Sequence, residues 1–203
     1  MIISLEGNIG SGKTTFLEAL AISCPEYEIV LEPVEEWMKE YDGHSILELF
    51  YQDKSRWAFT FQNYAIQTLV NAVKNVLDSN KIIVTERSAL TSRYVFAQML
   101  KEAGHISEVE WALYLKMFED YSSQVPLNGI IFLTTGPEVS AQRIMDRGRP
   151  GETVSLEYLN ELDQKHRAWL DSSELPVLRI GSEYSAEYNV EMVKVFINSL
   201  IRN

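Results

Sequence analysis

The sequence predicts an α/β fold with a central parallel sheet of about five strands and helices on both faces. Three observations predict this fold class. Five short apolar segments rich in β-branched residues are spread through the 203 residues, and helical patterns separate them. The segments are nearly continuous apolar runs rather than alternating ones, as strands buried on both faces are. No repeat or linker divides the chain, so we expect a single domain over residues 1–203.

The apolar segment over residues 2–6 comes first and runs directly into a glycine-rich loop. The other four predicted strands are residues 28–31, 81–85, 129–134 and 177–180. The clearest helical pattern covers residues 54–77, where Trp57, Phe61, Tyr64, Thr68 and Ala72 recur at steps of three and four. Alternating strands and helices imply right-handed crossovers, and such sheets bind ligands beyond the carboxyl ends of their strands.

Composition limits the classes of partner. The chain has 29 acidic and 18 basic residues, a formal net charge of −11, and no basic stripe or tail. We therefore expect it to bind neither nucleic acid nor a membrane surface. The chain begins on a strand and holds no apolar run of spanning length, so we expect no leader peptide. The lone cysteine, Cys24, fits a reducing compartment, which completes the expectation of a cytoplasmic protein.

The glycine-rich loop fits the pattern G-x-x-x-x-G-K-[ST] between a strand and the helix-compatible run TFLEALAI. In that setting backbone N–H groups surround an anion, Lys13 reaches the outer phosphates of a nucleotide, and the Thr14 hydroxyl can hold magnesium. An ordinary glycine-rich turn is the alternative, but motif, strand and helix agree. The predicted phosphate loop comprises Gly7, Asn8, Ile9, Gly10, Ser11, Gly12, Lys13, Thr14 and Thr15.

Charged residues follow two other predicted strands. Glu32 lies in LEPVEEW after the second strand, and Glu86 and Arg87 lie in TERS after the third. Both segments should converge beside the phosphate loop. Phosphoryl transfer needs magnesium, cations and a group that accepts the proton of the nucleophile. Glu32 could accept it, with Arg87 steering the oxygen and Glu86 helping to position magnesium. A solvated loop carboxylate is the alternative for Glu32.

Five segments taken together resemble the deoxynucleoside kinase family: GNIGSGKTTF, LEPVEEW, RWAFTFQNYA, ERSALTSRYVFA and RIMDRGRPGE. Their order and approximate spacing match over nearly the whole chain, from Ile2 to about Leu200. The phosphate loop alone is shared by many enzymes, whereas the other segments are specific. The resemblance implies a P-loop kinase fold and transfer of the γ-phosphate of ATP, with Mg²⁺, to the 5′-hydroxyl of a deoxynucleoside in nucleotide salvage. It also implies a homodimer, for which residues 54–77 are a candidate contributor.

The resemblance carries roles to individual residues. It implies that Glu32 is the general base with Arg87 beside it, and that Thr14 and Glu86 serve the magnesium. Gln62 matches the glutamine that reads the base. The other implied contacts to base and sugar are Val34, Trp37, Tyr51, Phe61, Ala65, Leu69, Ser92, Phe96 and Glu152. Plain core or surface positions are the alternatives, although Gln62, Ala65 and Leu69 share one helical face.

Residues 143–152 resemble the lid that closes over the donor phosphates in this family. Arg143, Arg147 and Arg149 can fork onto phosphate oxygens and neutralise charge in the transition state. A solvated helix end with basic residues is the alternative. Glu152 matches a lid glutamate that shares the sugar 3′-hydroxyl with Tyr51. The stretch from Arg149 to Leu156 is one residue shorter than in the vertebrate enzymes.

The predicted base specificity depends on a departure from the family. In deoxycytidine and deoxyguanosine kinases an arginine and an aspartate pair where this chain has Leu69 and Ser92. An apolar lining suits the 5-methyl group of thymine, so we predict a pyrimidine-preferring kinase that uses thymidine well and deoxycytidine detectably. Two other functions stay open. A thymidylate-type nucleoside monophosphate kinase would need a cation for the acceptor phosphate. A non-catalytic NTP-binding switch would need a motif such as N-K-x-D, which the sequence lacks.

Overall fold

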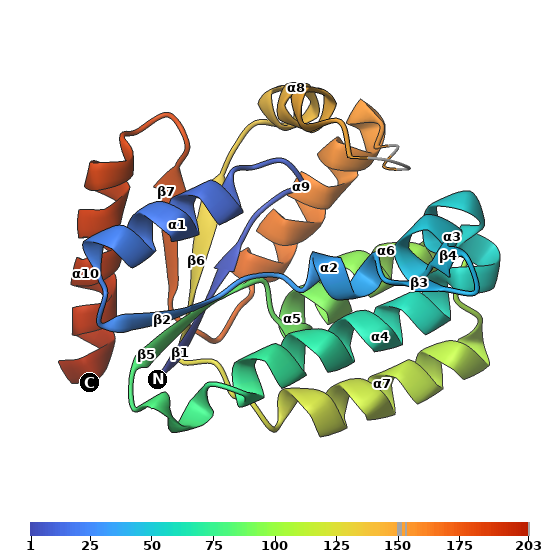
Figure 1. The fold of residues 1–203 in the computed structure, drawn as a ribbon, viewed down its shortest axis with the longest axis horizontal. Coiled ribbons are helices and arrows are strands. Elements are labelled where there is room, and N and C mark those ends of the chain that lie inside the picture. The colour runs from blue at the N-terminus through green and yellow to red at the C-terminus, as the bar shows by residue number, and fades with distance from the viewer. Residues whose placement is uncertain (150–151, 153, 203) are drawn as a thin grey trace.

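A parallel five-stranded sheet forms the centre of the computed structural model, which describes residues 1–149, 152 and 154–202 (Figure 1). Its strand order is β2-β5-β1-β6-β7, which confirms the predicted fold class. The strands are β1 (Ile2–Glu6), β2 (Tyr27–Val30), β5 (Ile82–Glu86), β6 (Gly129–Thr134) and β7 (Val177–Gly181). Their bounds differ from the predicted ones by at most one residue, and Glu86 is the last residue of β5 rather than the residue after it.

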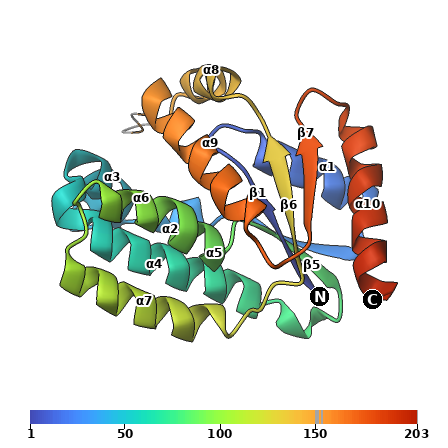
Figure 2. The same ribbon diagram turned by 180° about the vertical axis from the view of Figure 1, so that it is seen from behind.

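Helices cover both faces of the sheet because each strand buries side chains on both. Ile3 and Leu5 of β1 pack on the face of α1 (Lys13–Ser23) and α10 (Ala186–Arg202), while Ile2 packs on the opposite face. The opposite face carries the other long helices, as Figures 1 and 2 show. They are α4 (Lys54–Lys74), α7 (Glu108–Ser122) and α9 (Leu156–Asp171).

Shorter elements complete the connections between the strands. They are α2 (Val34–Trp37), β3 (Glu40–Tyr41), β4 (His44–Ser45), α3 (Ile46–Gln52), η1 (Leu77–Ser79), α5 (Ala89–Thr91), η2 (Ser92–Phe96), α6 (Ala97–Glu102) and α8 (Pro137–Arg147). The segment η2 is a π-helical turn between α5 and α6. Strands β3 and β4 form a small hairpin that the sequence reasoning missed. Its turn residues, Asp42 and Gly43, both have positive φ, as a two-residue hairpin turn requires.

The helix predicted over residues 54–77 ends earlier than expected, at Lys74. Val76 leaves the helical conformation with φ −119°, and the short turn η1 follows. Asn80 then adopts a left-handed φ of 56°, which reverses the chain into β5. The apolar residues Val76 and Leu77 continue the helical pattern in the sequence, but the turn needed to reach β5 stops the helix first.

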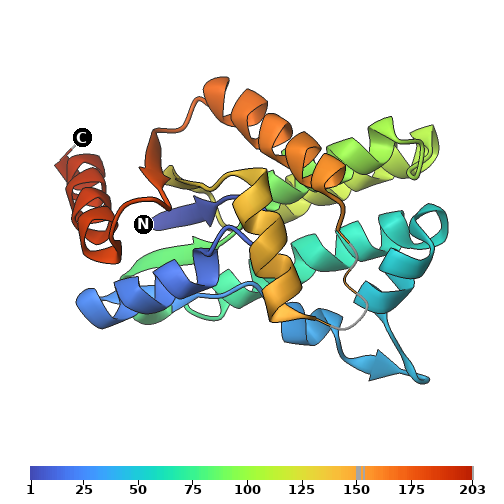
Figure 3. The same cartoon turned by 90° about the horizontal axis from the view of Figure 1, so that it is seen from above.

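The position of β1 at the middle of the sheet places the functional site. The chain leaves β1 toward β2 on one side and later reaches β6 on the other, so the order of strands reverses at β1. The crevice beyond such a point is where open parallel sheets bind ligands. Figure 3 shows α8 lying over this end of the sheet, next to the start of α1. Within the described residues, no helix combines the length and apolar character needed to cross a membrane.

Candidate active site

A cavity of about 910 Å³ opens at the carboxyl ends of β1, β2 and β5. Most of the predicted site residues line it: Ile9, Gly10, Ser11, Gly12, Lys13, Thr14, Thr15, Glu32, Val34, Trp37, Tyr51, Phe61, Gln62, Ala65, Leu69, Glu86, Arg87, Ser92, Phe96, Arg143, Arg147, Arg149 and Glu152. Gly7 and Asn8 are not among the lining residues. Asn8 instead connects the loop to α9, because its side-chain amide group donates to the Leu159 carbonyl and accepts from the Ile9 N–H.

The phosphate loop is packed around the Lys13 side chain. Lys13 Nζ donates to the carbonyls of Asn8 at 2.7 Å and Gly7 at 3.3 Å. Burial, and secondarily the nearby Arg87 cation, lowers the pKa of Lys13 to about 7. Negative charge on phosphate oxygens bound in the loop would favour the charged form of Lys13 and raise its pKa again.

Helix α8 supports the other side of the loop. Arg143 Nη1 and Thr135 Oγ1 both donate to the Ser11 carbonyl, at 2.7 and 2.9 Å. Gly10 has φ 72°, and a Cβ there would lie 2.6 Å from the Ser140 carbonyl oxygen. Only glycine satisfies both the backbone conformation and this close approach. Gly10, which lies at a variable position of the motif, therefore lets the loop pack directly against α8.

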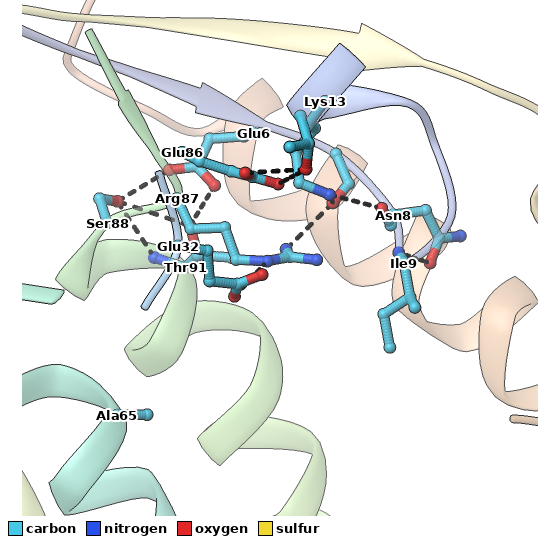
Figure 4. A network of polar contacts seen from close by, with 12 residues as sticks. Glu6, Asn8, Ile9, Lys13, Glu32, Ala65, Glu86, Arg87, Ser88 and Thr91 are labelled. Carbon is cyan, nitrogen blue, oxygen red and sulfur yellow. Dashed lines mark hydrogen bonds and ion pairs between the residues drawn. The ribbon is translucent and has the colours of Figure 1, made fainter. Parts of the chain in front are cut away.

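Glu32 and Arg87 meet at the opposite wall of the cavity, as predicted. Arg87 Nε lies 2.9 Å from Glu32 Oε1, an ion pair in which the N–H is not aligned for a hydrogen bond. Arg87 Nη1 donates to the Gly7 carbonyl at 3.0 Å, and the guanidinium lies 4.8 Å from the Phe96 ring centroid. Figure 4 shows Arg87 reaching past Glu32 toward the phosphate loop. A carboxylate and a cation thus face the place where transferred phosphate would arrive.

Thr14 and Glu86 come together at the end of β5. Thr14 Oγ1 donates to the Glu86 carboxylate, 3.0 Å from one oxygen and 3.1 Å from the other. These are hard oxygen donors beside the phosphate loop, the ligand set that Mg²⁺ takes when phosphates and water supply the remaining ligands. The described residues contain no cluster of three or more metal-binding side chains. The pair therefore fits an ion shared with a nucleotide rather than a protein-only metal centre.

Aromatic rings and a buried amide form the inner end of the cavity. Trp37 meets Phe61 edge to face at 5.4 Å, and Phe61 stacks on Phe50 at 4.7 Å. Trp37 also donates its ring N–H to Thr68 Oγ1 at 2.8 Å, which fixes the orientation of this wall. Gln62 is buried beside them. A flat ring with polar edges would fit between such walls and find one amide to pair with.

Comparison with known proteins identifies the family of this chain. The family model for deoxynucleoside kinases matches residues 3–202. The chain belongs to the deoxynucleoside kinase family. It is 37% identical over 194 residues to a fowlpox virus protein named "probable deoxycytidine kinase", covering 89% of this chain and 78% of that one. It is 34% identical to human deoxycytidine kinase over 98% and 91% of the two chains. It is 32% identical to the mitochondrial deoxyguanosine kinase of Xenopus laevis over 92% and 83%.

Membership of this family makes the protein an ATP-dependent nucleoside kinase. Its arginine-rich segment lines the cavity. Arg147 Nη2 lies 2.6 Å from Glu152 Oε2, and Arg149 Nη1 lies 3.7 Å from Glu152 Oε1. Burial, followed by the Glu152 charge, raises the pKa of Tyr51. Tyr51 and Glu152 both line the cavity, and their shared contact to the sugar stays a prediction. Residues 150 and 151 of the predicted lid lie outside the described residues.

Several lining residues of the kinase were missed by sequence reasoning. They are Leu31, Pro33, Glu35, Glu36, Leu47, Phe50, Lys54 and Tyr158. Lys54 is the first residue of α4, whereas Tyr51 lies in α3, and the break at Asp53 removes any helical spacing that would have connected them. Its ammonium sits 4.9 Å from the ring centroid of Tyr158. Tyr158 gives no local signal, because it reaches the cavity only through the docking of α9.

Proposed function

We propose that this kinase transfers the γ-phosphate of ATP to the 5′-hydroxyl of a deoxynucleoside, prefers pyrimidines, and serves nucleotide salvage. The supporting observation is the Glu32–Arg87 pair, with 2.9 Å between Oε1 and Nε, opposite Lys13 in a single cavity. A carboxylate at this place can accept the hydroxyl proton as the oxygen attacks. Arg87 and Lys13 are close enough to stabilise negative charge that spreads over the transferred group.

The remaining charged residues complete the donor side of the proposed mechanism. Arg143, Arg147 and Arg149 line the cavity beyond the loop and can neutralise phosphate oxygens. Thr14 and Glu86 would hold Mg²⁺, which supplies charge neutralisation and orientation for the donor phosphates when bound. Tyr51 and Glu152 would bind the sugar 3′-hydroxyl. Aligning donor and acceptor across the cavity supplies most of the rate enhancement in such transfers.

An unphosphorylated acceptor fits the cavity better than a nucleotide. The segment after β2 lines the cavity with the carboxylates of Glu32, Glu35 and Glu36 rather than with an extra cation, and these charges would repel an acceptor that already carries a phosphate. Transfer of radiolabelled phosphate from ATP should therefore be seen with thymidine and be negligible with thymidine monophosphate. The reverse result would favour the thymidylate-kinase alternative, and no transfer to either would point to a different nucleoside as the acceptor.

The proposed pyrimidine preference depends on Leu69 and Ser92. Both residues line the cavity and are only 4% exposed, so the base end carries no ion pair at these two positions. An apolar surface there favours a thymine methyl group, while the Gln62 amide can pair with thymine or cytosine by flipping. We expect thymidine to be the better substrate, deoxycytidine a detectable one, and purines poorer.

The test of specificity compares kcat/KM for the four deoxynucleosides in the wild type and in Leu69→Arg/Ser92→Asp. The double variant should lose thymidine efficiency by roughly 10- to 100-fold, since it buries an ion pair where a methyl group would sit. Efficient use of purines with negligible thymidine activity in the wild type would sink the specificity proposal. The assignment as a nucleoside kinase would stand.

We also propose a homodimer formed through α4 and α7, which lie side by side in Figures 1 and 2. Val109 and Leu113 of α7 are 71% and 47% exposed and lie one helical turn apart, so they form one apolar face. Light scattering after size exclusion should give twice the mass of 23.3 kDa. Leu113→Glu should lower that mass to the monomer, whereas Ile22→Glu at the distant end of α1 should not. A monomeric wild type would refute the proposal.

A further inference from the structure

Arg87 has an unusual backbone. Its φ is 63°, in the left-handed region that residues other than glycine rarely adopt. Its side chain nevertheless has to reach two places at once, the Gly7 carbonyl and the Glu32 carboxylate. A conformation of this kind persists only where the surrounding structure fixes it, and such positions gather at functional sites. Something must therefore hold the backbone on either side of Arg87.

On the N-terminal side, the sheet holds the residue. Arg87 N–H donates to the Leu5 carbonyl at 3.0 Å, which continues the pairing of β5 with β1. On the C-terminal side, the next residue, Ser88, begins α5. The Ser88 hydroxyl accepts from the Thr91 N–H at 3.4 Å, so Ser88 caps this short helix. The helix that Ser88 caps continues without a break through η2 into α6, so the turn at Arg87 lies directly before its first residues.

Glu6 adds a side-chain support from the neighbouring strand β1. It is the last residue of β1, its side chain is fully buried, and one carboxylate oxygen accepts from Ser88 Oγ at 2.8 Å. The other oxygen accepts from Thr91 Oγ1. Burial raises the pKa of Glu6, while the two hydroxyl donors oppose that change. Figure 4 shows Glu6, Ser88 and Thr91 gathered at the base of Arg87.

A buried carboxylate is costly, and a strand end in a parallel sheet usually carries an apolar residue. Here both carboxylate oxygens are used, and both partners lie within four residues after Arg87. Glu6 is also bonded through its backbone to Gly7, whose carbonyl accepts from Arg87 Nη1. The same side chain thus ties the start of the phosphate loop to the turn that carries Arg87.

We propose that Glu6 is a positioning residue for phosphoryl transfer. By accepting hydrogen bonds from Ser88 and Thr91, it holds Arg87 in its left-handed conformation. The guanidinium is thereby placed between Gly7 and Glu32. The inference rests on the proposed function, in which Arg87 stabilises charge at the transferred group. Without these hydrogen bonds the backbone of Arg87 relaxes toward ordinary φ and ψ angles, and the guanidinium moves away from its position. Misplacement of a catalytic group by about 1 Å can cost about 100-fold in rate.

The test removes one hydroxyl group and keeps the shape of the side chain. Thr91→Val deletes the hydroxyl that Glu6 accepts from, and Thr134→Val is its matched control, because Thr134 Oγ1 donates to the Ile180 carbonyl at 2.9 Å outside the cavity. Thr91→Val should lower kcat for thymidine roughly 10- to 100-fold with little change in the KM for ATP. Thr134→Val should leave both constants unchanged at a comparable loss in Tm.

A second arm measures whether Glu6 acts through Arg87. In an Arg87→Ala background, which is itself slow, Thr91→Val should cause no further loss of kcat, because the group being positioned is gone. Glu6→Gln should retain most of the wild-type kcat, since an amide can accept from one hydroxyl and donate to the other. Glu6→Ala should resemble Thr91→Val or be slower.

The outcomes separate the inference from the proposed function. Three results would each overturn the positioning role. The first is a double variant, Thr91→Val with Arg87→Ala, whose loss of kcat equals the product of the two single losses. The others are a Glu6→Gln enzyme as slow as Glu6→Ala and a Thr91→Val enzyme with normal kcat. Wild-type turnover in Arg87→Ala would refute the role of Arg87 in the proposed function itself, and the inference would fall with it.

Discussion

Replacing Glu32 by Gln is the most direct test of the proposed mechanism. The amide keeps an oxygen where Oε1 now lies, 2.9 Å from Arg87 Nε, but it cannot accept a proton at neutral pH. Substrate binding should therefore survive while proton transfer is lost. General-base catalysis contributes roughly 10²- to 10⁴-fold to rate, so kcat should fall by that factor. This corresponds to about 3–5 kcal/mol of transition-state stabilisation.

The structure also predicts the accompanying change in stability. The side chains of Glu32 and Arg87 are 18% and 5% exposed, so the substitution leaves a largely buried cation beside a neutral group. Arg87 keeps its hydrogen bond to the Gly7 carbonyl, and solvent reaches the Glu32 side. We therefore expect a loss of about 1–2 kcal/mol in the free energy of unfolding, below the range for breaking a fully buried ion pair. The variant should stay folded at assay temperature.

The assay is initial-rate ADP release with thymidine and ATP, together with thermal unfolding of each variant. Glu40→Gln is the control, because Glu40 is an exposed carboxylate in β3 outside the cavity lining. The expected result is a large loss of kcat with KM for thymidine within about threefold of the wild type. A raised KM with unchanged kcat would make Glu32 a binding residue and refute its assignment as the base.

Three further predictions concern the buried titratable groups Lys13 and His166. Lys13→Ala should abolish transfer while the protein stays folded, and ATP binding to the wild type at pH 8 should take up as much as about one proton, because the pKa of Lys13 is lowered to about 7 without phosphate. Calorimetry in two buffers of different ionisation enthalpy measures this uptake, and an equal uptake by Lys13→Ala would contradict it. Burial lowers the pKa of His166 to about 3, so the unfolded chain binds the proton first and stability is lost as pH falls below about 6.5. Urea unfolding should show roughly 2 kcal/mol less stability at pH 5 than at pH 6.5 from this group, and His166→Leu should remove that part of the slope.

The fold and much of the cavity were predictable because their signals are local. Buried parallel strands appear in the sequence as short apolar runs, and the carboxyl ends of such strands lie at one edge of the sheet. Glu32 and Glu86 therefore fall beside the phosphate loop once the strands are identified. Helix ends were harder, since Val76 and Leu77 continue an apolar pattern that the turn into β5 interrupts.

Residues that act across long sequence separations could not be predicted in the same way. Glu6 reads as the polar end of an apolar strand, and its hydroxyl partners are 82 and 85 residues away. Tyr158 enters the cavity only because α9 packs beside η2 and the phosphate loop, through contacts such as that between Asn8 and Leu159. No spacing within a motif encodes such a contact, because tertiary packing decides it.

The distribution of charge explains how an acidic protein can hold a polyphosphate. The chain carries a net charge of −11, yet six of its cations line one cavity: Lys13, Lys54, Arg87, Arg143, Arg147 and Arg149. At physiological ionic strength charges are screened beyond about 8 Å, so distant surface carboxylates contribute little to the potential inside the cavity. Cations within a partly buried site act through a lower effective dielectric and are screened much less. The cations of the cavity can therefore attract phosphate oxygens although the chain as a whole is acidic.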